Sequence, residues 1–201
     1  MDKKEFLIFA SIFLLISFLY FFKLDKLPPA IHGDEAWIAI QSLEIIKNPT
    51  HLIGVGWYDL PLLSFVPHAL GMWIFDKNIL GNRLGSVFFG LATLPIFYLL
   101  LKTFLNKRTA MITTIIFATS NLWLALSRLG IMYVQAAFFL TISIYFLVLG
   151  VKYNKRIFFI LTGISIGMGM YSYYAIRALP LIIFPLVLFI YFIKEVLEIE
   201  Y

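Results

Sequence analysis

Residues 60–75, LPLLSFVPHALGMWIF, form the apolar stretch whose placement decides the topology of this chain. The stretch is shorter than the roughly 20 residues that a helix needs to cross the hydrocarbon core of a bilayer, which is about 30 Å thick. It also contains Pro61, Pro67 and His68. Whether residues 60–75 cross the membrane must therefore be decided from the sequence around them. The side of the membrane on which each later turn lies depends on the answer.

Six apolar runs flank this stretch, and each is long enough, the last one marginally, to form a membrane-spanning helix. They lie at residues 6–22, 84–101, 109–126, 129–151, 157–176 and 178–193. The run at 6–22 exceeds the core of a signal peptide, about 7–15 residues, and no small-x-small site follows it, so we expect an uncleaved span. With 62% hydrophobic residues and a mean hydropathy of +0.93, the sequence predicts an all-α, polytopic membrane protein.

The positions of lysine and arginine favour a topology in which residues 60–75 do not cross. In that topology the basic turns "KTFLNKR" and "KYNKR" lie on the cytoplasmic side with the N-terminus, as the positive-inside bias requires. If residues 60–75 crossed, both turns would face outward. We therefore predict six spans with both termini inside, residues 60–75 as a re-entrant or surface-lying helix, and residues 1–201 as a single integral membrane domain.

Residues 23–83 then form one long outer segment between the first two spans, and this segment contains the first candidate site. It includes "HGDEAWIAI", in which Asp34 and Glu35 stand at the start of a surface helix predicted at residues 34–48. We place Asp34 at the N-cap of that helix. Acidic residues are favoured at helix starts because backbone N–H groups are free there. Capping is therefore one interpretation of the pair, and it does not exclude catalysis.

The charge pattern argues against several classes of function. No predicted span carries an ionisable group in its middle, which argues against a transporter. The net charge of +5 comes from short clusters rather than a long basic stripe, so we predict no nucleic-acid partner. Cysteine is absent, which excludes thiolate chemistry.

Two glycine pairs spaced one helical turn apart, Gly81 with Gly85 and Gly163 with Gly167, predict close helix packing.

The remaining polar residues gather at the predicted outer surface. The candidate site residues are Asp34, Glu35, Asp59, His68, Arg83, Arg128 and Arg177. For the arginines, the alternative interpretation is that guanidinium groups at span ends extend to the membrane surface. The three histidines with nearby acids could also hold a divalent ion, although their spacing matches no strong metal motif.

These residue types suit group transfer from a lipid-linked sugar. An enzyme that faces away from the cytosol needs a donor anchored in the membrane, and a polyprenyl-phosphate sugar meets that need. Because the leaving group is a phosphate, the reaction requires a carboxylate base for the acceptor hydroxyl and cations for the departing anion. Asp34 or Glu35 supplies the base, and Arg128 and Arg177 supply guanidinium groups whose planar fork matches phosphate oxygens.

The order of segments resembles the N-terminal module of the C-type membrane glycosyltransferases. The resemblance rests on "HGDEAWIAIQSLEIIKN", "GWYDLPLLSFVPHALGMWIF", "NRLGSVFFGLATLPIFYLLL" and "FATSNLWLALSRLGIMYVQAAFFL", and it covers essentially all of residues 1–201. Most similar are the protein O-mannosyltransferases that use dolichyl-phosphate-mannose and the bacterial aminoarabinose–lipid A transferases. The resemblance implies that Asp34 is the general base, with Glu35 as its companion.

Further residues are matched one by one. Asp59 matches an acid in a motif where Leu60 stands in place of the usual lysine, and Arg83 matches an arginine that opens the next span. Arg177, within "YSYYAIRALP", is implied as a contact for the lipid phosphate or the acceptor. The stretch "LGIMYVQAA" has no carboxylate where the aminoarabinose transferases place a second acid, so a two-acid metal site is not expected, and we assign no metal ligands.

We therefore predict a membrane glycosyltransferase that transfers a sugar from a polyprenyl-phosphate donor to an acceptor on the extracytoplasmic face, with inversion. In a prokaryote the membrane would be the plasma membrane. Family members usually continue for several more spans, so we expect the sequence to be the N-terminal part of a longer enzyme. Two alternatives stay open: a non-catalytic membrane scaffold or partner subunit, and a transporter or lipid flippase.

Overall fold

The computed structural model describes residues 3–48, 56, 59–182 and 185, and over these residues it is helical with no β-strand. This confirms the predicted all-α class. In chain order the elements are α1 (Lys3–Phe21), α2 (Gly33–Lys47), η3 (Leu62–Ser64), α3 (Val66–Phe75), α4 (Ile79–Leu101), α5 (Lys107–Thr119), α6 (Asn121–Arg128), α7 (Tyr133–Tyr153), α8 (Arg156–Met170) and η4 (Tyr174–Ala178).

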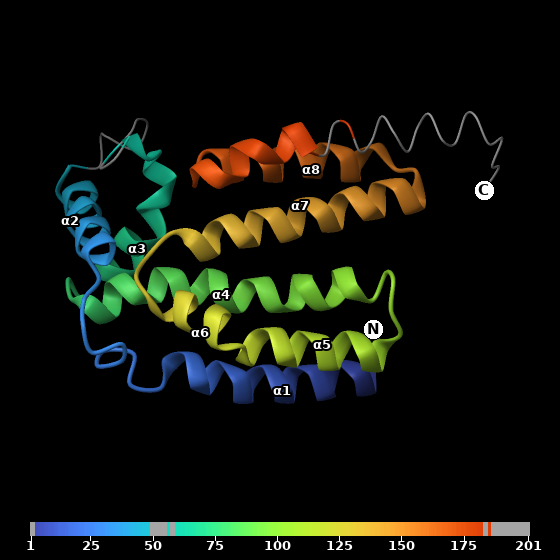
Figure 1. The fold of residues 1–201 in the computed structure, drawn as a ribbon, viewed down its shortest axis with the longest axis horizontal. Coiled ribbons are helices and arrows are strands. Elements are labelled where there is room, and N and C mark those ends of the chain that lie inside the picture. The colour runs from blue at the N-terminus through green and yellow to red at the C-terminus, as the bar shows by residue number, and fades with distance from the viewer. Residues whose placement is uncertain (1–2, 49–55, 57–58, 183–184, 186–201) are drawn as a thin grey trace.

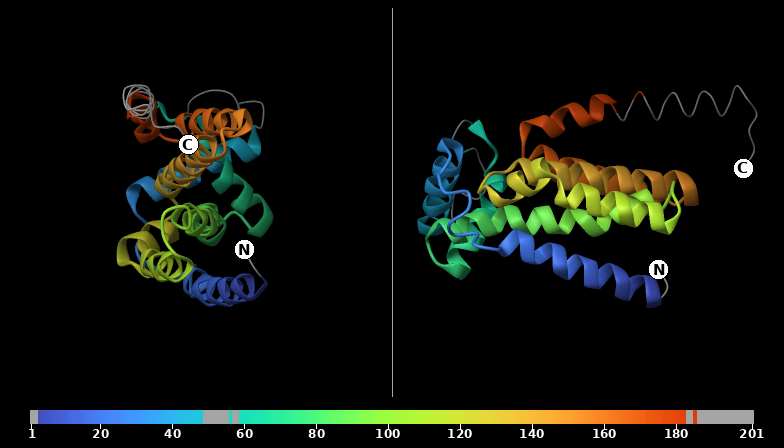
Figure 2. Two further views of the ribbon diagram at one scale, coloured as in Figure 1. Left: turned by 90° about the vertical axis from the view of Figure 1, so that its right-hand side faces the viewer. Right: turned by 60° about the horizontal axis from the view of Figure 1, so that its bottom comes forward.

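The long helices form an antiparallel bundle, and the short helices α2 and α3 cover one of its ends (Figure 1). We call this the Asp34 end. The opposite end holds the start of α1 and the turns at residues 102–106 and 154–155, and we call it the basic end. Figure 2 shows the same arrangement from two further directions, with α2 at one end of the bundle in the right-hand view. Each long helix therefore connects the two ends.

The main apolar core lies where α1, α4, α6 and α7 meet. Tyr20, Val87, Leu94 and Trp123 are buried there, and the Tyr20 hydroxyl donates a hydrogen bond to the carbonyl oxygen of Ala118 at 2.8 Å. Outside this contact region α1 is largely exposed, since only 11% of its most apolar window is buried. Exposed apolar side chains on a long helix are what a lipid environment requires.

Three of the described helices, α1, α4 and α7, are long and apolar enough to cross a membrane. The chain is thus an integral membrane protein. A fourth span results if α5 and α6 are taken together, although they are bent by 56° at the break between them. The six predicted spans are not confirmed, and most of the sixth, residues 178–193, lies outside the described residues.

The predicted span at 109–126 is wrong as a single helix, because the helix breaks at Ser120. This residue has an extended backbone (φ −61°, ψ 140°), and its hydroxyl oxygen accepts a hydrogen bond from the Trp123 backbone N–H at 3.4 Å. Serine is a preferred N-cap because its oxygen satisfies an N–H group that would otherwise lack a partner. The charge-free run at 109–126 therefore contains two helices, α5 and α6, with the capping residue Ser120 between them.

The predicted span at 157–176 is also wrong in its extent, because α8 ends at Met170. Its 15 residues rise about 22 Å, less than the roughly 30 Å of a bilayer core. The backbone N–H groups of Tyr171 and Ser172 bind the carbonyl oxygens of Gly167 and Gly169 and close the helix. Ser172 is then buried in a polar network described below, which a continuing helix would not reach.

The helices predicted at residues 34–48 and 60–75 both form, with different starts. The N-cap of α2 is His32 rather than Asp34, because the His32 Nδ1 accepts a hydrogen bond from the Asp34 backbone N–H at 3.3 Å. The helix predicted at 60–75 becomes an α-helix only at Val66, after the short η3. Pro67 stands in the first turn of α3, where the missing N–H of a proline costs little.

Helix α3 packs against the start of α4 through glycines. A Cβ atom at Gly81 would lie 2.4 Å from the Asp76 carbonyl oxygen, and one at Gly85 would lie 2.8 Å from the His68 backbone nitrogen. This confirms close packing for the first glycine pair. For Gly163 and Gly167 close packing is not confirmed, because a Cβ atom at either position meets no described atom within 4 Å.

Candidate functional site

Asp34 lies in the first turn of α2, and its carboxylate is partly accessible. The side chain is 38% exposed. Its Oδ2 accepts a hydrogen bond from the Tyr133 hydroxyl at 3.4 Å, and the His32 Nδ1 lies 3.9 Å from the same oxygen. Asp34 is therefore a carboxylate that a substrate hydroxyl can approach while Tyr133 holds its orientation.

A row of tyrosines connects Asp34 with Arg177. The ring centroid of Tyr133 lies 5.3 Å from that of Tyr173, which lies 6.1 Å from that of Tyr174. The Arg177 guanidinium lies 4.7 Å from the Tyr174 ring centroid, within the range of a cation–π contact. We call Tyr133, Tyr173 and Tyr174 the tyrosine row. It joins the start of α2, the start of α7 and η4, and it brings two predicted site residues together along one set of contacts.

Arg177 keeps its guanidinium accessible. The residue is exposed, and among the described residues no carboxylate forms an ion pair with it. It lies in η4 (Tyr174–Ala178), directly after the turn that ends α8. The other two predicted arginines, Arg83 and Arg128, donate hydrogen bonds to the backbone of α1 or of the segment that follows it. Arg177 forms no such bond among the described residues.

Glu35 is adjacent to Asp34 in the sequence but is fully buried. Its Oε1 accepts hydrogen bonds from the Arg83 Nε at 2.7 Å and the Gly130 backbone N–H at 3.0 Å, and its Oε2 accepts one from the Arg83 Nη2 at 3.2 Å. Neighbouring residues on an α-helix point about 100° apart, because a turn contains 3.6 residues. The two carboxylates therefore meet different surroundings, and Glu35 joins α2 to α4 and to the segment before α7.

Arg83 is 1% exposed, and all its contacts are with the protein. Besides Glu35, it donates hydrogen bonds to the carbonyl oxygens of Leu24 at 2.9 Å and Pro28 at 3.0 Å. The guanidinium thus fixes the segment that follows α1 against α4. A direct contact between Arg83 and a phosphate would require the loss of these bonds.

Arg128, the last residue of α6, binds the end of α1. Its Nη1 donates to the Leu19 carbonyl oxygen at 2.5 Å, and its Nη2 donates to those of Phe22 at 2.6 Å and Leu27 at 3.2 Å. The last carbonyl groups of a helix lack partners within the helix and carry partial negative charge. Arg128 supplies such partners, so its donors are directed to the end of α1 and to the segment that follows it.

His68 is buried in α3 and takes part in a polar network. Its Nδ1 lies 2.8 Å from the Asn82 carbonyl oxygen, and its Nε2 lies 3.3 Å from the Gln135 side-chain nitrogen. A carbonyl only accepts, so Nδ1 carries the hydrogen and Nε2 accepts from the amide. Burial lowers the pKa of His68 to about 4, against the opposing effects of the Asn82 bond and the Glu35 charge. The imidazole is therefore neutral at pH 7.

Gln135 extends this network to the segment after α8. Its amide nitrogen donates to the Ser64 carbonyl oxygen at 3.0 Å, and its Oε1 accepts from the Ser172 hydroxyl at 2.8 Å. The Ser64 hydroxyl donates in turn to the Ser172 carbonyl oxygen. The sequence reasoning assigned no role to these residues. The available signal was the presence of amide side chains, Asn82 and Gln135, beside or within apolar runs.

Asp59 is exposed in a turn, with a φ of 54°, and its backbone N–H donates to the Gly56 carbonyl oxygen at 3.1 Å. His51, one of the histidines considered for a metal, lies outside the described residues. Over the part of the chain that the structure describes, no group of three or more His, Cys, Asp or Glu side chains could hold a metal ion. The site that the geometry assembles is thus Asp34, the tyrosine row and Arg177.

Comparison with known proteins gives a family and a set of relatives. Residues 59–197 match the family model described as dolichyl-phosphate-mannose-protein mannosyltransferase. Three curated relatives are each named undecaprenyl phosphate-alpha-4-amino-4-deoxy-L-arabinose arabinosyl transferase. The Erwinia tasmaniensis protein is 24% identical over 171 residues, which is 81% of this chain and 31% of that protein.

The Serratia proteamaculans protein is 27% identical over 145 residues, 69% of this chain and 26% of that protein. The Pseudomonas aeruginosa protein is 26% identical over 124 residues, 59% of this chain and 23% of that protein. The chain thus spans less than a third of the length of these relatives. No solved structure matches it significantly.

Proposed function

Because this chain belongs to the dolichyl-phosphate-mannose-protein mannosyltransferase family, we propose that it is a glycosyltransferase, or part of one, that uses a polyprenyl-phosphate-linked sugar as donor. The names of the relatives support this donor class, since each names an undecaprenyl phosphate-linked sugar. The membrane-spanning helices also support it, because they keep the protein in the bilayer where such a donor is dissolved. The acceptor in this proposal is a hydroxyl group.

Asp34 acts as the general base in the proposed reaction. The acceptor oxygen attacks the anomeric carbon while its proton passes to the Asp34 carboxylate. The bond between the anomeric carbon and the phosphate oxygen breaks, and its electron pair leaves with the phosphate. Attack from the face opposite the leaving group inverts the anomeric centre. The partial exposure of Asp34 and its bond to Tyr133 support this role.

Arg177 stabilises the departing phosphate in this proposal. Its guanidinium is accessible, and a guanidinium can donate two parallel hydrogen bonds to phosphate oxygens. The tyrosine row lies between base and cation and offers flat apolar ring faces to the donor. The observation that carries the proposal is this continuous set of contacts from Asp34 to Arg177.

The other predicted site residues receive supporting roles. Glu35 and Arg83 are positioning residues, because their buried pair fixes the start of α2 and therefore Asp34. Arg128 holds the end of α1 near the same surface. His68 holds α3 against α4 and α7 through Asn82 and Gln135. Asp59, which is exposed, is a further substrate contact.

We also propose that the Asp34 end faces away from the cytosol. The turns at the basic end carry lysine and arginine, which favour the cytoplasmic side. The proposed topology has six spans with both termini inside, and it counts α5 with α6 as one span and adds the short α8 and residues 178–193 as further spans. In a prokaryote the membrane is the plasma membrane.

The decisive experiment is a transfer assay on membranes that contain the protein. Membranes are incubated with radiolabelled polyprenyl-phosphate sugars, and the label is followed from lipid to product. We expect Asp34→Asn to lower the rate by about 10²–10⁴-fold, the range for loss of a general base. Asp25→Asn is the matched control, because Asp25 is an aspartate nine residues earlier, exposed in the segment between α1 and α2 and outside the candidate site.

Membrane insertion of each variant is checked by carbonate extraction. If the wild type transfers the label and Asp34→Asn transfers it at the same rate, the assignment of Asp34 as general base is contradicted. Accessibility of position 34 to a membrane-impermeant reagent applied only from the cytosolic side would contradict the proposed orientation.

A further inference from the structure

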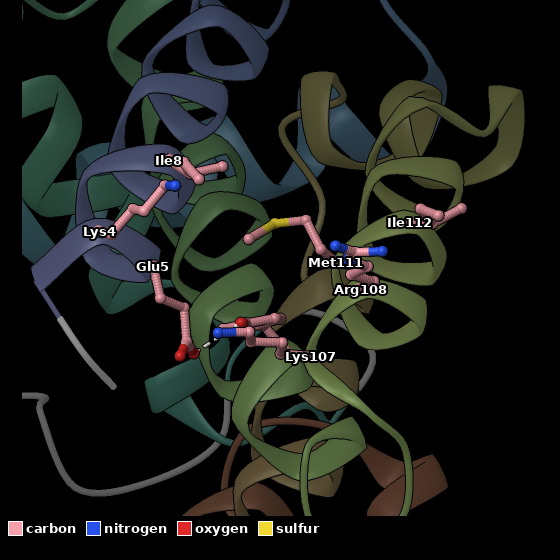
Figure 3. Close-up of a pocket in the computed structure, with 8 residues that line it drawn as sticks. Lys4, Glu5, Ile8, Lys107, Arg108, Met111 and Ile112 are labelled. Carbon is pink, nitrogen blue, oxygen red and sulfur yellow. Dashed lines mark hydrogen bonds between the residues drawn. The ribbon is translucent and has the colours of Figure 1, made fainter.

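A cavity of about 510 Å³ opens at the basic end of the bundle, between α1, α4 and α5. Figure 3 shows residues of α1 on one side of this cavity and residues of α5 on the other. Its lining includes Lys4, Glu5, Ile8, Lys107, Arg108 and Ile112. It lies at the opposite end of the long helices from Asp34, so the proposed transfer reaction does not use it.

The cavity carries a net positive charge. Among the described residues, three cationic side chains and one carboxylate line it, and all three cationic residues are exposed. The carboxylate belongs to Glu5, which forms an ion pair with Lys102 and accepts a hydrogen bond from the Tyr98 hydroxyl at 2.8 Å. Lys102 lies outside the lining, so among the described residues the lining cations outnumber the one lining carboxylate.

One wall of the cavity is apolar, and it continues along the helices toward the middle of the membrane. Ile8 follows Lys4 by four residues on α1, and Ile112 follows Arg108 by four residues on α5. Residues four apart lie on the same face of a helix. Ile8 is 47% exposed and Ile112 is 57% exposed. The cavity therefore combines cations at the membrane surface with accessible hydrocarbon next to them.

We propose that this cavity binds the phosphate head group of an anionic phospholipid, with an acyl chain against Ile8 and Ile112. Basic pockets between membrane helices bind anionic lipid head groups. The volume also lies in the range of about 300–1,000 Å³ that is typical of small-ligand sites. A free phosphate ion would use the cations but leave the apolar wall uncovered, which is why a lipid is the better ligand.

The test uses the purified chain in a neutral detergent, titrated with phosphatidylglycerol, with phosphatidylcholine or with inorganic phosphate. Binding is followed by microscale thermophoresis. We expect saturable binding of phosphatidylglycerol alone. The double substitution Lys4→Gln with Arg108→Gln should weaken it by about fivefold for each charge removed. The matched control is Lys152→Gln with Lys155→Gln, which removes two exposed charges at the same end, outside the cavity lining.

A second variant, Ile112→Ser, tests the apolar wall without changing any charge, and it should also weaken the binding of phosphatidylglycerol. The unfolding midpoint of every variant is compared in lipid-free detergent, so that a loss of binding is separated from a loss of folding. Equal binding of phosphatidylcholine, or an equal loss of affinity in the control variant, would overturn the proposal. Saturation of the site by inorganic phosphate would overturn the lipid as its ligand.

Discussion

At the Asp34 end of the bundle, Glu35 and Arg83 are buried and bonded to each other, whereas at the basic end Lys4, Lys107 and Arg108 are exposed around a cavity. The difference shows two uses of charge. A buried ion pair is destabilising to break, because the remaining charge has neither water nor a partner. Exposed charges are hydrated and can be changed at little cost to folding. Charge therefore fixes the packing of helices at the Asp34 end, and at the basic end exposed charge lines the cavity that we propose as a lipid site.

Breaking the buried pair should have the largest effect. Arg83→Met leaves the Glu35 carboxylate buried without a cation, and we expect it to lower the free energy of unfolding by about 3–5 kcal/mol. Lys4→Met removes an exposed cation at the basic end, so we expect a loss of about 1 kcal/mol or less. Titration with sodium dodecyl sulfate measures both. Equal losses would remove the distinction between the two ends.

The close contact of α3 with α4 should be the next most sensitive feature. Gly85→Leu places a side chain where a Cβ atom already lies 2.8 Å from the His68 backbone nitrogen. We expect a loss of up to about 3 kcal/mol in the free energy of unfolding. Gly163→Leu is the matched control, because its Cβ atom meets no described atom within 4 Å. A similar loss in the control would show that glycine itself, and not the contact, matters.

The buried histidine makes the Asp34 end sensitive to pH. The pKa of His68 is about 4 in the folded protein and about 6.5 in an unfolded chain. The unfolded state thus binds the proton more readily, and stability falls as the pH drops from 6.5 toward 4. We expect a loss of about 2 kcal/mol at pH 5. His68→Gln should remove this part of the pH dependence, and His32→Gln, which replaces an exposed histidine, should retain it.

The smallest expected effect concerns the orientation of the proposed base. Tyr133→Phe removes the hydroxyl that binds Asp34 at 3.4 Å, a long hydrogen bond. We expect the transfer rate to fall by about two- to fivefold, which corresponds to a net hydrogen-bond contribution near 0.5–1 kcal/mol. Tyr153→Phe, at the other end of α7, is the control and should leave the rate unchanged. An equal decrease in both variants would contradict a specific role for Tyr133.

The resemblance in motifs and their order predicted the family, which is confirmed. Hydrophobic pattern and charge placement predicted the all-helical class and helices within residues 34–48 and 60–75, and these are also confirmed. They did not predict the break at Ser120 or the end of α8 at Met170. Both are set by local hydrogen bonds, from a serine cap and from glycine carbonyls, within runs that are free of charged residues. Apolar pattern shows which residues avoid water, but not where a helix stops.

The candidate site was predicted only in part. The acidic pair and the arginines were visible as charges, but their burial was not. Glu35 and Arg83 are 48 residues apart in the sequence, so their pairing depends on how α2 packs against α4. The tyrosine row was not predicted as a unit for the same reason, because its members come from α7 and from the segment after α8. Helix packing decides that Asp34 stays accessible while the adjacent Glu35 is buried.

The attachment of α1 has a mechanical consequence. This helix is fastened at one tip by Arg128, which holds the carbonyl groups of Leu19 and Phe22, and at the other tip by the pairing of Glu5 with Lys102. Between the tips, few of its side chains are covered by the protein. A helix that is bound at both ends and surrounded mainly by lipid can bend in its middle while the contacts at both ends stay intact. We therefore expect the middle of α1 to absorb changes in bilayer thickness while the two ends keep their register.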